Sequence, residues 1–435
     1  MTLSQGYRRY VLSLLAVVYG LTYVDRCLIV LLLQPIKDDL HLSDTQLGFV
    51  TGIAFGLFYA TLGVPIARWA DRGNRVSIAS LAIGLWGLTV MATLLVRNFA
   101  LLVVVRIAAA VGESGSMPPT YSLLGDYFPA AGERTRAMAL YMLGPSVAAL
   151  LSFAVGGQLN DYYGWRYTFF LMGSPALLLA VVVKLSAFEP RTEAVANSAP
   201  AVTPPLSAVL GSLWRRDSTL HLSIAIILLW TMGLGLQPWY AAFMMRSHGM
   251  ATGELGLWLG IIFGLSGIVG ILLGGYVVAR WFHGNEQGQF QLTALTTAAL
   301  VPIYMLFLLV PQKHQALVAL IPIGMVFNFL IGPTFAILQR LVPSEMRATT
   351  MAVVMLLANL IGMGLGPQLV GLLSDLLVSR FGNDSLRYSM LIMSVIAFWA
   401  AYHFLRVGRT VSDDLVALSL PPGVVCGSRE LTQTS

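Results

Sequence analysis

Four charged residues lie inside two of the chain's apolar runs, where a translocon scale puts an isolated charge at about 2.5 to 3.5 kcal/mol at the centre of a spanning helix. Asp25 and Arg26 lie in the first run, and Arg106 and Glu113 lie in the fourth. Buried carboxyl groups can bind and release a proton, and guanidinium groups can bind an anion. We therefore predict that Glu113, coupled with Asp25, carries a proton, and that Arg106 and Arg26 bind an anionic group of a substrate.

The alternative for these four charges is a static network that holds two helices together. A rise of about 1.5 Å per residue places Asp25, Arg26 and Arg106 in one layer, roughly 12 to 13 Å below the outer ends of their helices. In that layer Asp25 could simply neutralise an arginine. Glu113 lies two helical turns further on, about 10 Å deeper on nearly the same face as Arg106. No basic residue lies within one turn of Glu113, and this setting favours proton binding.

Membrane-spanning helices are the elements that must position these charges. Hydrophobic residues make up 57% of the 435 residues and charged residues only 11%, against about 25% charged in a typical soluble domain. Apolar runs of the length that a span needs, roughly 20 residues, recur along the chain with short polar breaks between them. The twelve predicted spans are 10–34, 45–70, 76–96, 98–122, 134–158, 164–187, 219–245, 253–279, 289–310, 315–340, 347–373 and 387–406.

A proline-rich segment at 189–218 divides these spans six and six, and the two halves repeat each other. An Ala-Arg-Trp triplet at 67–69 recurs at 279–281, and a Gly-x-Leu-x-Asp pattern at 157–161 recurs at 371–375. Internal repeats of this kind are typical of transporter folds. We predict an all-α membrane protein with an N-terminal six-helix bundle, a cytoplasmic linker, a C-terminal six-helix bundle and a cytoplasmic tail at 1–188, 189–218, 219–406 and 407–435.

The distribution of basic residues predicts the orientation of the chain. Of the 26 Lys and Arg residues, 17 fall on one set of alternate loops and 7 on the other, and Arg26 and Arg106 lie within spans. Loops rich in Lys and Arg stay cytoplasmic. We therefore expect a multi-pass protein of the cell (inner) membrane, with both termini cytoplasmic. The same rule explains the net charge of +6 without a nucleic-acid partner.

The loop between the second and third spans resembles the cytoplasmic loop signature of the major facilitator superfamily. Residues 63–75 read GVPIARWADRGNR, in which Asp71 and Arg72 match the Asp-Arg of the signature and Arg75 matches its later basic residue. Ala67 is a departure, because the superfamily usually has glycine there. The resemblance implies that Asp71, Arg72 and Arg75 form a gating loop, with Asp71 accepting from a neighbouring helix N-terminus. The alternative is ordinary positive charge on a cytoplasmic loop.

Two further motifs resemble the spinster branch of this superfamily. Tyr23, Asp25 and Arg26 match its Tyr-x-Asp-Arg, and Arg106 with the Gly-Glu pair that ends at Glu113 matches its Arg and Gly-Glu. Eukaryotic members of this branch export lysolipids and sphingolipids. The superfamily resemblance covers nearly the whole chain. It implies the major facilitator fold, in which two pseudo-symmetric bundles rock against each other around a central cavity and so give alternating access.

The second half of the chain predicts an apolar wall for this cavity. Trp230, Gln237 and Trp239 in the seventh span and Asn328 in the tenth lie among apolar residues, with no acid or base in the interior of either span. We predict that these four residues bind substrate together with Tyr23 of the first span. The alternative for the aromatic residues is packing, or anchoring at the membrane interface.

These observations together predict a secondary active transporter, proton-coupled, for an amphipathic anion such as a lysolipid or a sphingolipid-like molecule. Small organic anions or drugs are the alternative substrates, and a receptor or channel is the alternative class. An enzyme, a metal site and ATP-driven pumping are disfavoured, because the six His residues include no pair at ligand spacing and no Walker-type phosphate loop occurs. We expect no cofactor and a monomer that interacts with its substrate, with protons and with the lipid bilayer.

Overall fold

The computed structural model describes residues 4–190 and 206–419 of the 435. Within these ranges the regular elements are all helices, which confirms the predicted all-α class. Ten helical segments there are long and apolar enough to cross a membrane, and two of them, 55 and 70 residues long, are long enough for two crossings each. The described residues therefore make the twelve predicted crossings.

The N-terminal bundle contains six crossings, several of them built from interrupted helices. The long helix α8 contains two helices joined at Gly164, whose φ of +78° lies in the region that favours glycine. The elements are α1 (Gln5–Leu31), α2 (Leu33–Leu40), α3 (Asp44–Thr51), α4 (Ile53–Arg72), α5 (Arg75–Ala92), α6 (Phe99–Ser114), α7 (Met117–Tyr127), α8 (Ala131–Gly173) and α9 (Pro175–Ser186).

The C-terminal bundle repeats this architecture. A π-helical segment, Asn359–Leu365, interrupts the eleventh crossing of the chain. Within the predicted linker 189–218, residues 206–215 form α11 and residue 217 begins α12. The elements are α11 (Leu206–Arg215), α12 (Asp217–Leu236), α13 (Trp239–His248), α14 (Thr252–Trp281), α15 (Glu286–Leu309), α16 (Lys313–Arg340), α17 (Arg347–Ala358), α18 (Gly366–Phe381), α19 (Ser385–Ser394) and α20 (Ile396–Ser419).

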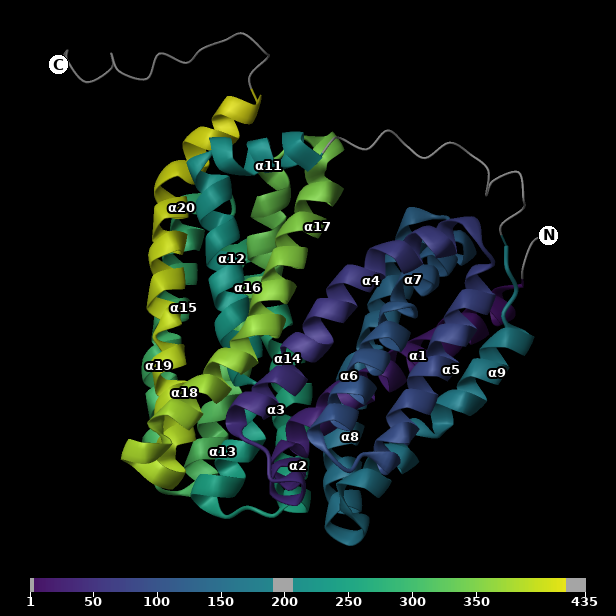
Figure 1. The fold of residues 1–435 in the computed structure, drawn as a ribbon. Helices are drawn as coiled ribbons and strands as arrows, with labels where there is room; N and C mark the ends of the chain where they lie inside the picture. Colours follow the sequence, from purple (N-terminus) through teal and green to yellow (C-terminus); the bar gives the residue numbers. More distant parts are fainter. Residues whose placement is uncertain (1–3, 191–205, 420–435) are drawn as a thin grey trace, which may run out of the picture.

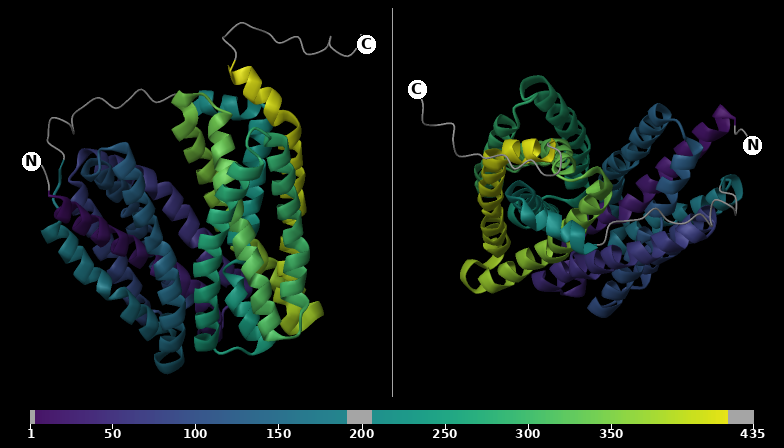
Figure 2. Two further views of the ribbon diagram at one scale, coloured as in Figure 1. Left: turned by 180° about the vertical axis from the view of Figure 1, so that it is seen from behind. Right: turned by 90° about the horizontal axis from the view of Figure 1, so that it is seen from above.

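The two bundles meet at one end of the molecule and diverge toward the other (Figure 1, Figure 2). Where they meet, α3 packs on α18 and α2 packs on α13. The start of α1 and the end of α20 lie at the other end. We call these two ends the closed end and the open end.

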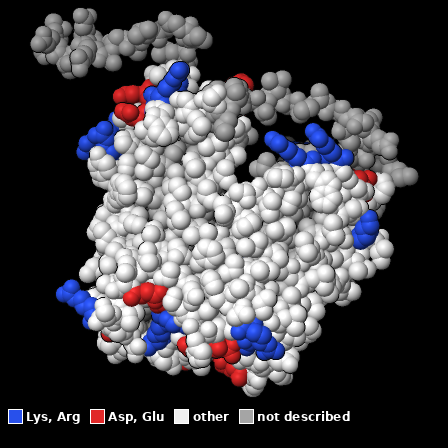
Figure 3. Space-filling model, in the orientation of Figure 1, with Lys and Arg blue, Asp and Glu red and all other residues white. Residues whose placement is uncertain are grey.

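Charged side chains collect near both ends of the face seen in Figure 3 and at its right edge, and a band between them shows no Lys, Arg, Asp or Glu. An uncharged band is what a bilayer core requires, because a charge exposed to hydrocarbon is costly. The charged layer that the sequence predicts in the middle of the molecule therefore faces inward on this side.

The last helix extends beyond the predicted span 387–406. Helix α20 continues to Ser419. Val407 and Val411 are fully buried against the bundle, and burial of these apolar side chains stabilises about three further turns of helix. The first part of the predicted tail 407–435 is therefore helical, and its assignment to the cytoplasm stays a prediction. The part of the tail that follows residue 419 lies outside the described residues.

Candidate functional site in the central cavity

A cavity of about 550 Å³ lies between the two bundles, within the range of about 300 to 1,000 Å³ that ligand pockets occupy. Its wall is formed by α1, α4, α6 and α8 on one side and by the C-terminal bundle on the other, and most of its lining residues are apolar. Five of the predicted substrate residues line it: Tyr23, Arg26, Arg106, Gln237 and Asn328. The structure therefore brings together residues from four of the predicted spans.

The four buried charges form two ion pairs between α1 and α6. Nη2 of Arg26 lies 2.8 Å from Oε1 of Glu113, and Arg106 pairs with Asp25. Asp25, Arg106 and Glu113 are nearly fully buried. The Arg26 side chain keeps 22% of its surface exposed and is the most accessible of the four. The charges sum to zero, and burial of ions is tolerated under that condition.

An aromatic shelf on α4, formed by Phe55 and Tyr59, supports both guanidinium groups. The two rings stack with their centroids 5.5 Å apart. Cζ of Arg26 lies 5.0 Å from the Phe55 centroid and 4.7 Å from that of Tyr59, and Cζ of Arg106 lies 4.7 Å from that of Phe55. Each contact is within the range of a cation–π interaction. Arg26 also lies 5.8 Å from the ring centroid of Tyr23.

Sequence reasoning missed this shelf. Phe55 and Tyr59 are four residues apart in the second predicted span, so their spacing places them on one helix face. Nothing in the sequence places that face against the first and fourth spans. The spacing of the two aromatic residues was the available signal. It indicates a shared helix face, and only the packing of the helices shows that this face contacts the two arginines.

Two buried polar atoms of these ion-paired side chains have no hydrogen-bond partner in the described part of the chain. They are Nε of Arg106 and Oε2 of Glu113. Buried polar atoms in native proteins are usually bonded, so such exceptions call for an explanation. Oε2 of Glu113 is free to hold a proton, and Nε of Arg106 is free to donate to an incoming acceptor.

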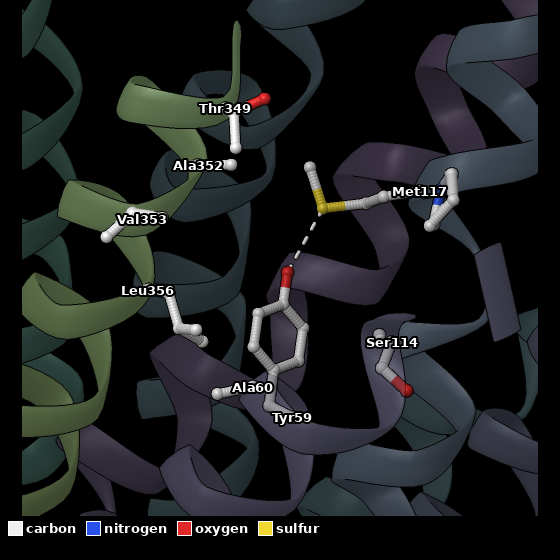
Figure 4. Close-up of a pocket in the computed structure, with 10 residues that line it drawn as sticks. Tyr59, Ala60, Ser114, Met117, Thr349, Ala352, Val353 and Leu356 are labelled. Carbon is white, nitrogen blue, oxygen red and sulfur yellow. Dashed lines mark hydrogen bonds between the residues drawn. The ribbon is translucent and has the colours of Figure 1, made fainter. Parts of the chain in front are cut away.

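A second cavity, of about 350 Å³, lies where α4, α6 and α7 face α17 (Figure 4). The Tyr59 hydroxyl points into it and donates to Sδ of Met117 at 3.2 Å. A thioether is a weak acceptor. The Tyr59 side chain therefore connects Arg26 to the second cavity, with its ring against the Arg26 guanidinium and its hydroxyl in that cavity.

Two predicted substrate residues, Trp230 and Trp239, lie elsewhere. Trp239 is fully buried, and Trp230 packs against Phe327 and Phe335 with centroids 5.2 and 5.6 Å apart. Neither lines the central cavity. Both residues pack inside the C-terminal bundle, which agrees with the alternative that these aromatic residues serve packing rather than substrate binding.

The predicted gating loop joins α4 to α5 at the open end. Arg75 is fully buried and pairs with Asp126 at 2.6 Å and with Glu189. Both partners belong to the N-terminal bundle or to the first residues after it, so Arg75 holds that bundle together in this conformation. Arg72 is exposed, and the side chain of Asp71 lies outside the described residues.

Two six-helix bundles around a cavity with a charged wall define the class of secondary transporters. The model of the Major Facilitator Superfamily matches residues 15–367 of the chain. The chain therefore belongs to the major facilitator superfamily, as its loop signature indicates.

Its relatives are transporters and efflux pumps rather than enzymes. An MFS-type efflux pump of Mycolicibacterium smegmatis is 30% identical over 399 residues, which cover 89% of this chain and 91% of the pump. Protein spinster homolog 1 of Mus musculus is 24% identical over 446 residues, which cover 95% of this chain and 83% of the homolog. Both the superfamily and the spinster likeness expected from the sequence are confirmed.

A solved structure agrees with this placement. A bacterial homologue of the human lysosomal transporter spinster, in an inward-facing and unoccupied conformation, matches with a TM-score of 0.80 and 27% identity. The match covers 94% of this chain and 99% of that protein. The chain is therefore a spinster-like member of the superfamily in fold as well as in sequence.

Proposed function

We propose that the chain is a proton-coupled transporter of an amphipathic anion, of the lysolipid or sphingolipid-like class, that works by alternating access as a monomer. The proposal rests on two ion pairs, Arg26–Glu113 and Arg106–Asp25, whose arginines lie in the wall of an otherwise mostly apolar cavity. We call them the crossed pairs, because each helix contributes an acid to one pair and a base to the other. Charges inside a membrane protein mark substrate and proton pathways.

The crossed pairs suggest how the proton and the anion are linked. When Glu113 takes up a proton, Arg26 loses the negative charge that compensates it. An uncompensated buried cation is costly, so the cavity then binds an anionic group more tightly. Thermodynamic linkage makes the effect mutual, and the bound anion raises the affinity of Glu113 for its proton. Proton and anion therefore bind the same conformation together.

The apolar part of the cavity supports an amphipathic substrate. Away from the arginines, α8 contributes Met142 and Leu143 and α14 contributes Ile271 and Leu272. These side chains are partly exposed in the structure. An anionic head bound at Arg26 leaves a hydrocarbon tail in contact with them, where its burial removes apolar surface from water.

The orientation belongs to the same proposal. The positive-inside rule places both termini in the cytoplasm, so the open end faces inward. The unoccupied inward-facing state of the spinster homologue supports this orientation. We propose the inner membrane as the location.

A second candidate substrate class, small organic anions or drugs, is favoured by one observation. The relative from Mycolicibacterium smegmatis is an efflux pump. The same charged residues serve this candidate as its anion-binding site, so the two candidates share the site and differ in the transported molecule.

The test is translocation of a labelled lysophospholipid by the purified protein in proteoliposomes, with and without an imposed pH gradient. We expect movement that depends on the gradient, and loss of that dependence in Glu113→Gln. The matched control is Glu133→Gln, because Glu133 pairs with Arg8 and is 51% exposed, far from the cavity. Absence of movement with folded protein discards the lipid class and favours organic anions. Unchanged gradient dependence in Glu113→Gln rejects the role of Glu113.

A further inference from the structure

Two seams hold the closed end together, and they are related by the internal repeat. In the first seam α3 of the N-terminal bundle meets α18 of the C-terminal bundle, and in the second seam α14 of the C-terminal bundle meets α8 of the N-terminal bundle. The roles of the bundles are exchanged between the seams, as a pseudo-twofold axis requires.

Each seam is closed by a carboxylate that caps the first turn of a helix in the opposite bundle. Asp375 accepts from the backbone N–H groups of Asp44 at 3.0 Å and Thr45 at 2.7 Å, where α3 begins. Asp161 accepts from the backbone N–H of Gly253 at 2.8 Å, where α14 begins. These are the two acids that end the repeated Gly-x-Leu-x-Asp pattern, and an acid at a helix N-terminus is stabilising.

The glycines of the same pattern allow the backbones of the two bundles to approach each other closely. A Cβ on Gly157 would lie 2.6 Å from the carbonyl oxygen of Thr252, and a Cβ on Gly371 would clash with the carbonyl oxygen of Asp44. Glycine is required at both places because any larger residue would push the bundles apart. The two seams therefore share one register, in which Asp44 and Thr252 are equivalent.

The seams differ at this equivalent position. In the second seam the Thr252 hydroxyl accepts from the Asn160 amide at 3.1 Å, which is a neutral contact. In the first seam the Asp44 carboxylate, 1% exposed, accepts from the Ser374 hydroxyl at 2.6 Å. Ser374 occupies the place in the pattern that Asn160 occupies in the second seam.

Asp44 also pairs with two cations. Both terminal nitrogens of Arg246 lie 2.7 Å from its two oxygens, and Nζ of Lys37 lies 2.5 Å from Oδ1. Arg246 is carried by α13 of the opposite bundle, and it also donates to Gln34 of the N-terminal bundle. The bidentate geometry is the strong form of such a pair.

We propose that the Asp44–Arg246 pair is an ionic latch that keeps the closed end shut. The second seam, which has an equivalent carboxylate cap but Thr252 in place of Asp44, opens once the latch has broken. Opening must separate Arg246 from Asp44, because they belong to different bundles. A buried charge that loses its partner while the end stays closed is strongly unfavourable, whereas water compensates it when the end opens. Removal of one partner therefore shifts the protein toward the state that is open at this end.

The test uses electron–electron double resonance between spin labels at Arg97 and Asn383, which are exposed loop positions of the two bundles near this end. The full chain is studied in lipid nanodiscs after Cys27→Ala and Cys426→Ser. The decisive variant is Asp44→Thr, which gives the first seam the residue type that Thr252 provides at the equivalent position of the second seam. We expect the ratio of long to short label distances to rise on the order of a hundredfold. Arg246→Gln should act less strongly, because Lys37 still pairs with Asp44.

The matched control is Thr252→Val, which removes the neutral contact of the second seam and should change the distance distribution by less than about fivefold. If Asp44→Thr does not fold, Arg246→Gln carries the test, with folding checked by size-exclusion chromatography. Distributions like that of the parent in both latch variants would overturn the proposal. So would a shift in Thr252→Val as large as that in Asp44→Thr. The readout needs no substrate, so its outcome is independent of the proposed transport activity.

Discussion

The two bundles share a helical plan but bury different chemistry. The N-terminal bundle holds two ion pairs between α1 and α6. The corresponding crossings of the C-terminal bundle present the amides of Gln237 and Asn328 to the same cavity. The repeat has kept the features that shape the backbone, such as the helix caps at the closed end, and has not kept the charges. Under the proposed function, the symmetry serves the alternating-access motion and the asymmetry serves recognition of the substrate.

The largest expected effect is loss of one partner from the more deeply buried pair. Arg106→Gln leaves Asp25 without a counter-charge in a nearly inaccessible place, which should cost about 3 to 5 kcal/mol of stability. The thermal unfolding midpoint in detergent should fall sharply. Asn328→Ala, in the other bundle, should cost about 1 kcal/mol at most. Equal destabilisation by both variants would contradict the contrast between the bundles.

The aromatic shelf gives the next largest effect. Phe55→Leu removes the ring that lies under both guanidinium groups, and each cation–π contact contributes about 0.5 to 2 kcal/mol. We expect an apparent KM for the transported anion raised up to about tenfold, with proton-gradient dependence retained. Phe55→Tyr keeps the ring and should behave like the parent protein. A KM unchanged in Phe55→Leu would show that the shelf does not position the arginines.

The amides of the uncharged wall should have a smaller effect that is confined to affinity. Gln237→Ala and Asn328→Ala each remove a polar group from the cavity lining. Loss of a neutral hydrogen bond of about 0.5 to 1.5 kcal/mol corresponds to roughly two- to tenfold weaker binding. Titration of each variant with a labelled lysophospholipid measures this change in binding affinity. Loss of pH-gradient dependence in either variant would place part of the proton site in the C-terminal bundle.

The smallest expected effect concerns the ion pair that Asp39, which lies between the first and second spans, makes at the closed end of the N-terminal bundle. Arg166 lies 2.7 Å from Asp39, and its hydrogen bond and charge hold the pKa of the Asp39 carboxyl below the usual value. The stability that this pair adds is present above the pKa of the unfolded chain and is lost as the pH falls through the lowered pKa of the folded protein. The Asp39 side chain is 42% exposed, so solvent screening limits the loss in Asp39→Asn to about 0.5 kcal/mol at pH 7. A larger loss of thermal stability would show that the pair is more than a surface contact.

Much of the fold and part of the site could be predicted from the sequence. The apolar runs are long enough to show each crossing, and the repeated Gly-x-Leu-x-Asp pattern shows the two halves. Helical rise alone places Asp25, Arg26 and Arg106 in one layer. The crossed pairing could not be predicted, because the partner of Glu113 lies on another helix.

The same limit applies to the closed end and to the shelf. Asp161 and Asp375 stand out as a repeat in the sequence, but their action as caps depends on a contact between opposite bundles. Phe55 carries no chemical signal until α4 is packed against α1 and α6. Local periodicity predicts elements and depth, whereas the pairing of faces follows from packing that the sequence pattern does not encode locally.

The central claim is that one charged layer binds the proton and the anion together. Proton uptake on substrate binding tests it most directly, measured with a pH indicator in weakly buffered purified protein as a lysophospholipid is added. We expect about one proton taken up per bound molecule near pH 7 in the parent protein, and none in Glu113→Gln. Binding without proton uptake, or uptake that survives Glu113→Gln, would contradict the account.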